Sequence, residues 1–130
     1  MNLFLYIQIT NKPEEVKFSN NFLSIIKEQE TDFATFDLDN HSESLIINHA
    51  IRLLSESKNA LIFIEAMPDS KFGNLLSLLN IVLDNPEGIE VIIKGENPKI
   101  EKMMSILPQI KVQKTTHEVQ TVREILSKFS

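Results

Sequence analysis

The sequence alternates between strand-like and helix-like segments along its whole length, and this alternation limits the choice of fold more than any other feature. Short runs rich in β-branched and aromatic residues recur at 3–9, 32–38, 60–66, 89–95 and 109–115. Helix-like segments, with apolar residues three or four positions apart, separate and follow these runs. Because parallel strands need a crossover connection, and each crossover here contains its own helix, the pattern predicts an α/β fold.

The five strand-like segments predict a three-layer α/β/α sandwich around a five-stranded parallel sheet in the flavodoxin-like order 2-1-3-4-5. Segment 60–66 is apolar almost throughout, as expected of a strand covered on both faces, whereas 32–38 and 109–115 alternate as edge strands do. No linker, repeat or low-complexity segment interrupts residues 1–130, so we expect a single domain.

Composition excludes several classes of function. The net charge is −5 and the acidic and basic residues are interspersed, so a clustered basic face for nucleic acid is not expected. No apolar run approaches the roughly 20 residues that cross a bilayer, and residues 1–12 lack the features of a signal peptide. The chain has no cysteine, which excludes disulfides and thiolate sites. We therefore expect a cytoplasmic protein with no membrane or nucleic-acid partner.

Local signals predict where the helices begin. A first helix is expected within 12–30, with Pro13 in its first turn, and Ser42 is expected to cap the second. Pro68 and Asp69 are expected to start the third helix, with Asp69 or Ser70 as its cap. Asn97, followed by Pro98 at the first helical position, is expected to cap the fourth.

The third helix has an unusually broad apolar arc. At 100° per residue one face carries the predicted core stripe, which consists of Phe72, Leu75, Leu76, Leu79, Val82 and Leu83. Leu78 and Ile81 lie outside that stripe. Either the neighbouring helices cover these two residues, or they form an exposed strip that another protein or a second copy of the chain covers.

Open α/β sheets bind ligands beyond the carboxyl ends of their strands, near the switch point between strands one and three. The side chains expected there as candidate ligand-binding residues are Thr10, Asn11, Asp37, His41, Glu65 and Asp69. The chain has only three glycines, at unrelated positions, so glycine-rich phosphate turns and a nucleophile elbow are not expected. His41 and His49 are eight residues apart, which does not fit a one-turn helical metal pair. The sequence therefore predicts no catalytic residue, cofactor or metal.

Two segments are similar to regulatory modules. The sequence EAMP (65–68) resembles the end of the third strand in response-regulator receiver domains, where a phosphorylated aspartate is soon followed by Met-Pro, and Lys114 matches the place of the lysine in that family. Thr10 and Asn11 stand where those domains have the acidic pair that holds magnesium, and Glu65 replaces the acceptor aspartate. The resemblance therefore implies a degenerate receiver that is not phosphorylated.

Residues 69–107 are similar to the helix–strand–helix part of anti-sigma-factor antagonist (STAS) domains. In that family a serine in the turn before the helix is regulatory, and Ser70 would match it. The consecutive strands that open those domains have no counterpart in this sequence.

The leading interpretation is a non-enzymatic cytoplasmic regulatory or protein-interaction domain, which binds a protein partner or self-associates as a homodimer through its third helix. One alternative is a small-ligand-binding protein or enzyme that uses acidic residues at the carboxyl ends of strands two and three. The other is a degenerate receiver-like or STAS-like module.

Overall fold

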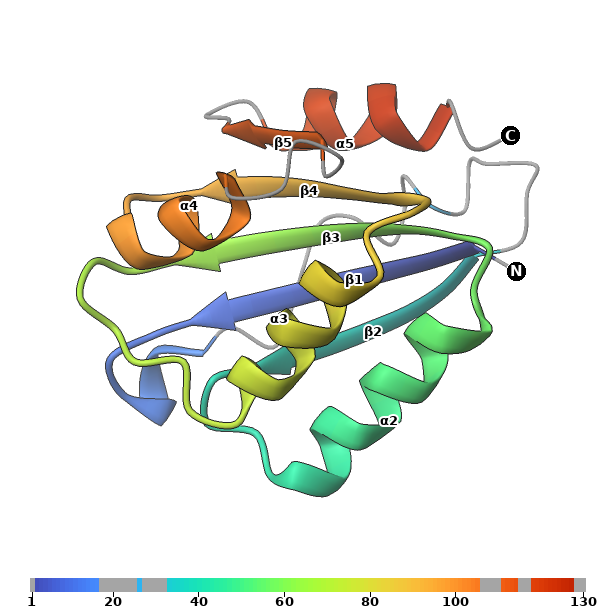
Figure 1. Ribbon diagram of the computed structural model, residues 1–130. Helices are drawn as coiled ribbons and strands as arrows, with labels where there is room; N and C mark the ends of the chain where they lie inside the picture. Colours follow the sequence, from blue (N-terminus) through green and yellow to red (C-terminus); the bar gives the residue numbers. More distant parts are fainter. Residues whose placement is uncertain (1, 17–25, 27–32, 106–110, 115–117, 128–130) are drawn as a thin grey trace.

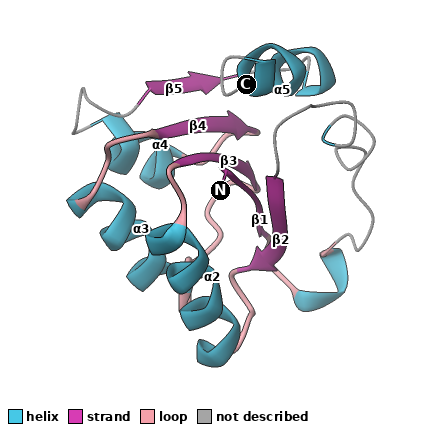
Figure 2. Ribbon diagram, turned by 90° about the vertical axis from the view of Figure 1, so that its right-hand side faces the viewer, coloured by secondary structure: helices cyan, strands magenta, loops and turns pink. Residues whose placement is uncertain are grey.

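A parallel sheet with helices on both faces forms the framework of the protein (Figures 1 and 2). The computed structural model describes residues 2–16, 26, 33–105, 111–114 and 118–127. The strands are β1 (Asn2–Ile9), β2 (Phe33–Asp39), β3 (Asn59–Ala66), β4 (Ile89–Lys94) and β5 (Lys111–Lys114). They lie in the order β2-β1-β3-β4-β5, and every neighbouring pair is parallel. The predicted α/β class and parallel sheet are confirmed.

The helices in the described part of the chain lie on both faces of the sheet. They are the short 3₁₀ turn η1 (Pro13–Glu15) and the α-helices α2 (Ser44–Glu56), α3 (Leu75–Asp84), α4 (Pro98–Ser105) and α5 (Glu118–Ser127). Figure 2 shows α2, α3 and α4 on one face and α5 on the other. The segment predicted as a first helix, 12–30, contains η1 near its start, and most of its remaining residues lie outside the described part. The complete three-layer sandwich therefore stays a prediction.

Strand alternation divides the core into two clusters. In β1 the odd-numbered residues Leu3, Leu5, Ile7 and Ile9 pack beneath α2, α3 and α4. The even-numbered Phe4 and Tyr6 pack with α5 on the opposite face. Every residue of β1 is buried, because the strand lies inside the sheet and is covered on both faces.

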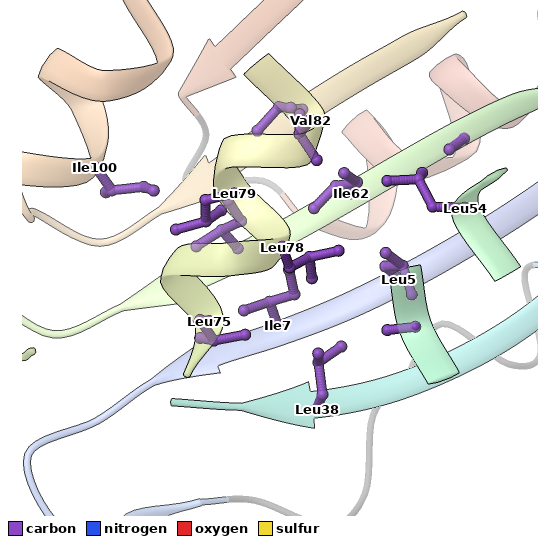
Figure 3. Close-up of a cluster of buried hydrophobic side chains, with 14 of the residues drawn as sticks. Leu5, Ile7, Leu38, Leu54, Ile62, Leu75, Leu78, Leu79, Val82 and Ile100 are labelled. Atoms are coloured by element: carbon purple, nitrogen blue, oxygen red, sulfur yellow. The ribbon is translucent and has the colours of Figure 1, made fainter. Parts of the chain in front are cut away.

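The core-facing side of α3 differs from the predicted stripe. Leu75, Leu78, Leu79 and Val82 are fully buried, and Figure 3 shows them directed toward the sheet near Leu5, Ile7 and Ile62. Leu76, assigned from the sequence to the core, is 44% exposed. The expectation that Leu78 forms part of an exposed strip is wrong, and Ile81 is only partly exposed and packs against the core. The reason is that α3 lies between α2 and α4 (Figure 1), so neighbouring elements cover a wider arc of it than a single sheet would.

Two predicted helix starts are also wrong. Ser42 does not cap α2, which begins after Glu43; its hydroxyl instead accepts a hydrogen bond from the Asp39 backbone N–H at 3.0 Å. Helix α3 begins after Asn74, several residues beyond Asp69 and Ser70. The Ser42 hydroxyl thus bonds within its own turn, whereas the Ser70 hydroxyl bonds to Asn11 in the loop after β1.

The predicted start of α4 is confirmed. The Asn97 carboxamide oxygen accepts a hydrogen bond from the Ile100 backbone N–H at 3.2 Å, and Pro98 is the first helical residue. The amide nitrogen of the same side chain donates to the Met67 carbonyl at 2.9 Å. Asn97 thus fastens the loop after β3 to the start of α4.

Replacing Asn97 with alanine is expected to lower the free energy of unfolding by about 1–2 kcal/mol, because both hydrogen bonds of this buried side chain are lost. Asn74→Ala is the control, since Asn74 precedes α3 without a side-chain capping bond and makes only an exposed 3.2 Å hydrogen bond to the Ser42 carbonyl among the contacts described. Chemical denaturation measures both values. Equal losses for the two variants would show that the capping bond of Asn97 contributes nothing to stability.

Candidate functional site

The candidate ligand-binding residues predicted from the sequence lie at the carboxyl edge of the sheet, but the structure separates them into groups. Thr10 and His41 are in contact, with 3.0 Å between the Thr10 hydroxyl oxygen and His41 Nε2. Asn11 lies beside the turn that contains Asp69, and Glu65 pairs with β4. Asp37 is exposed on β2, where its register partner is Tyr6.

The Asn40 side chain connects three of the loops at this edge. Its carboxamide oxygen accepts from the Thr10 backbone N–H at 3.0 Å. Its amide nitrogen donates to the carbonyl oxygens of Thr10 at 2.8 Å and Lys71 at 2.6 Å. One buried carboxamide therefore links the segments that follow β1, β2 and β3.

The Thr10 hydroxyl has a defined proton arrangement. It donates to the Lys12 carbonyl at 2.9 Å, so its single proton is already used. With the hydroxyl proton directed to the Lys12 carbonyl, His41 can contact the same oxygen by donating from Nε2–H. In this arrangement the pair has the geometry of a structural contact.

Ser70 is buried, with only 2% of its surface exposed. Its hydroxyl donates to the Asn11 side-chain oxygen at 2.6 Å. Asp69, next to it, has a φ of 60°, which turns the chain so that Ser70 faces inward. In this arrangement the hydroxyl that would match the regulatory serine of STAS domains is inaccessible to a modifying enzyme.

Two glycines allow the loops of this edge to approach neighbouring backbone closely. A Cβ atom at Gly73 would lie 2.3 Å from the Asn40 carbonyl oxygen, and one at Gly95 would lie 2.2 Å from the Ala66 carbonyl oxygen. Both have positive φ, 56° and 96° respectively. A larger residue at either position would force the loops apart.

A cavity of about 160 Å³, here called the switch-point cavity, lies beyond the carboxyl ends of β1, β3 and β4. Non-consecutive strands β1 and β3 are neighbours there, which is the usual ligand position in open α/β sheets. The residues that line it are Gln8, Ile9, Thr10, Glu15, Glu65, Ala66, Met67, Lys94 and Gly95.

Oppositely charged side chains from neighbouring strands meet at this cavity. Glu65 and Lys94 are register partners on β3 and β4, and Lys94 Nζ lies 3.8 Å from Glu65 Oε1. The other carboxylate oxygen of Glu65 accepts a hydrogen bond from the Tyr6 hydroxyl. Glu15 is also held in place, because its Oε1 accepts from the Lys12 backbone N–H at 2.8 Å. The carboxylates are therefore oriented by the fold.

Sequence reasoning identified Glu65 and Thr10 but did not select Tyr6, Gln8, Glu15 or Lys94 as site residues. Gln8 and Glu65 are register partners, as are Glu65 and Lys94. The signal that could have found Gln8 and Lys94 is the register of adjacent parallel strands, which places polar residues near strand ends side by side. That signal requires the strand order to be known.

Further features bear on the class of site. Among the described residues no group of three or more His, Cys, Asp or Glu side chains is placed to hold a metal ion. No helix in the described part of the chain has the length and apolarity needed to cross a membrane. Comparison of the chain with protein-family models, with curated proteins and with solved structures found no match in any of the three.

Proposed function

We propose that the protein is a cytoplasmic, non-enzymatic regulatory domain that binds a small zwitterionic molecule in the switch-point cavity. The observation that carries this proposal is the meeting of the Glu65 carboxylate and the Lys94 ammonium group at a cavity beside the switch point. The Lys94–Glu65 separation of 3.8 Å is longer than the 2.7–2.9 Å of a close charge-assisted hydrogen bond.

The charges at the cavity define the class of ligand. Lys94 can receive a carboxylate, and Glu65 together with Glu15 can receive an ammonium group. The volume of about 160 Å³ is below the roughly 300–1,000 Å³ of sites for drug-sized molecules. A molecule of the size of a small amino acid fits both properties.

The hydrogen bonds of two hydroxyl groups at this edge favour a binding function over a catalytic one. The Thr10 hydroxyl donates to a backbone carbonyl, and the buried Ser70 hydroxyl donates to Asn11. Neither donates its proton to a base, which an activated nucleophile must do. The regulatory role rests on the resemblance of segment 65–68 to receiver domains, whose functional acid stands at the same strand end.

The structure weakens the argument for self-association through the third helix. A homodimer of the expected kind would cover Leu78 and Ile81, but Leu78 is already fully buried within one chain. We therefore propose a small ligand, in preference to a second copy of the chain, as the partner of this domain.

Glycine is expected to bind more tightly than acetate or methylammonium. Glycine carries both a carboxylate and an ammonium group, whereas each of the other two carries only one of them. Lys94→Met and Glu65→Gln are each expected to weaken glycine binding about tenfold, the loss of one charge-assisted hydrogen bond. Isothermal titration calorimetry and amide chemical shifts of residues around Gln8 and Gly95 measure these effects.

Lys99→Met is the matched control, since Lys99 is exposed on α4 and does not line the cavity. It is expected to leave glycine binding unchanged. Absence of glycine binding at millimolar concentration, or equal binding of glycine, acetate and methylammonium, would contradict the proposal. An equal effect of Lys99→Met and Lys94→Met would show that net charge alone controls binding.

A further inference from the structure

A second cavity lies at the opposite edge of the sheet, where β3 and β4 begin and where α2 and α3 end (Figure 1). We call it the amino-edge cavity. Its volume is about 320 Å³, which falls within the range of sites for small organic ligands. Its apolar lining consists of Leu54, Ala60, Ile81 and Ile89. Ile81, which the sequence places outside the core stripe of α3, thus contributes to a cavity within one chain.

The walls of the amino-edge cavity are fixed by hydrogen bonds. At the end of α2, Ser57 donates from its backbone N–H to Leu54 O at 3.2 Å and from its hydroxyl to Leu53 O at 2.6 Å. At the end of α3, the Asn85 backbone N–H donates to Ile81 O at 3.0 Å. These bonds pair the Leu53, Leu54 and Ile81 carbonyls and hold both helix ends in place without a ligand.

Gly88 fixes the third wall. Its carbonyl accepts a hydrogen bond from the Ala60 backbone N–H at 2.9 Å, and a Cβ atom at this position would lie 2.7 Å from the Lys58 carbonyl oxygen. The backbone before β4 therefore lies directly against the backbone before β3. Gly88 lines the cavity at this contact.

The electrostatics of the amino-edge cavity favour a cation. Lys58 and Glu87 both line it, and their formal charges balance. The carboxyl ends of α2 and α3 then decide the sign of the electrostatic potential in the cavity, because each helix end is equivalent to about half a negative charge. A positively charged group is thus favoured over a carboxylate, because Lys58 and Glu87 offset each other and the two helix ends add negative potential.

We propose that the amino-edge cavity binds a small amphipathic cation, with an aromatic or branched aliphatic body against Leu54 and Ile81 and an ammonium group near Glu87 and the helix ends. This site is separate from the switch-point cavity and does not rest on the function proposed for it. Glycine has no apolar body and is not a ligand of the amino-edge cavity.

A titration with benzylammonium, benzyl alcohol and benzoate tests the proposal, because the three probes share an aromatic body and differ in charge. We expect affinity to fall in that order and amide chemical shifts to change at Ser57, Asn85 and Gly88. Glu87→Gln is expected to weaken benzylammonium binding about threefold, as for a partly solvated ion pair, and to leave benzyl alcohol binding unchanged. Glu14→Gln, at an exposed position in η1, is the matched control.

Ser55→Phe gives a second, independent readout. Ser55 is exposed and lines the cavity, so a phenyl group there is expected to occupy the space of the probe while the fold is kept. Loss of benzylammonium binding in a variant with an unchanged unfolding midpoint supports the proposal. Benzoate binding as tightly as benzylammonium, shifts confined to residues outside the cavity, or no shift with any probe at millimolar concentration would each overturn it.

Discussion

Replacing Leu78 with alanine is expected to lower the free energy of unfolding by about 3 kcal/mol, and replacing Leu76 with alanine by less than about 1 kcal/mol. Leu78 is fully buried against the sheet, so its truncation leaves a cavity among residues that cannot fully close around it. Leu76, two positions earlier on the same helix, is 44% exposed and leaves no enclosed space when shortened. Urea denaturation with an unchanged m-value measures both differences.

The same pair of variants separates a core residue from an interface residue. If Leu78 belongs to the core of one chain, its contribution is independent of protein concentration. If a second copy of the chain covered it, the loss of stability would grow with protein concentration, because association stabilises the folded state by mass action. A greater loss for Leu76→Ala than for Leu78→Ala would restore the core stripe that the sequence predicts.

Replacing Asn40 with alanine is expected to cost about 3 kcal/mol, although the residue belongs to a loop. The change removes the bonds to Thr10 N–H, Thr10 O and Lys71 O. Thr10 is 5% exposed, so its N–H and carbonyl would be left with little access to water, and an unsatisfied buried group costs about 1–3 kcal/mol. Thermal and urea denaturation measure the loss.

Asn40→Asp distinguishes the hydrogen bonds from the volume of the side chain. Aspartate has nearly the same size and keeps an acceptor for the Thr10 N–H, but its carboxylate cannot donate to either carbonyl. We expect it to be at least as destabilising as alanine. Asn85→Ala serves as the control, because the exposed Asn85 side chain makes only a long 3.4 Å contact with Ile81 O. An ordinary surface substitution costs less than about 0.5 kcal/mol. A loss below that value for both Asn40 variants would contradict the proposed contribution of the Asn40 hydrogen bonds to stability.

The strands and the start of α4 could be predicted because their causes are local. Alternation of apolar and polar residues and the Asn97-Pro98 pair act within a few positions of the chain. The core-facing side of α3 could not be predicted in the same way. Its apolar residues cover so much of the helix that periodicity alone does not decide between Leu76 and Leu78. Contact with elements far away in sequence decides it.

In the candidate site, too, some features could be predicted from the sequence and others depend on tertiary contacts. Its position at the carboxyl ends of the strands follows from the fold class, and Thr10 and Glu65 were found on that basis. The pairing of Glu65 with Lys94 depends on the register of β3 with β4. Asp69 and Ser70 were misassigned as helix caps because their polar side chains are typical of both caps and loop contacts. Only the tertiary position of Asn11 distinguishes the two roles for Ser70.

The hydrogen bonds that Asn40 makes to Thr10 and Lys71 also have a kinetic consequence for any ligand of the switch-point cavity. The segment after β3 separates from Asn40 only when the bond to Lys71 breaks, and the segment after β1 separates from it only when both bonds to Thr10 break. An encounter complex at the cavity then needs no prior ordering of loops. Association would be governed by diffusion and electrostatic steering, and differences in affinity between related ligands would reside in their residence times.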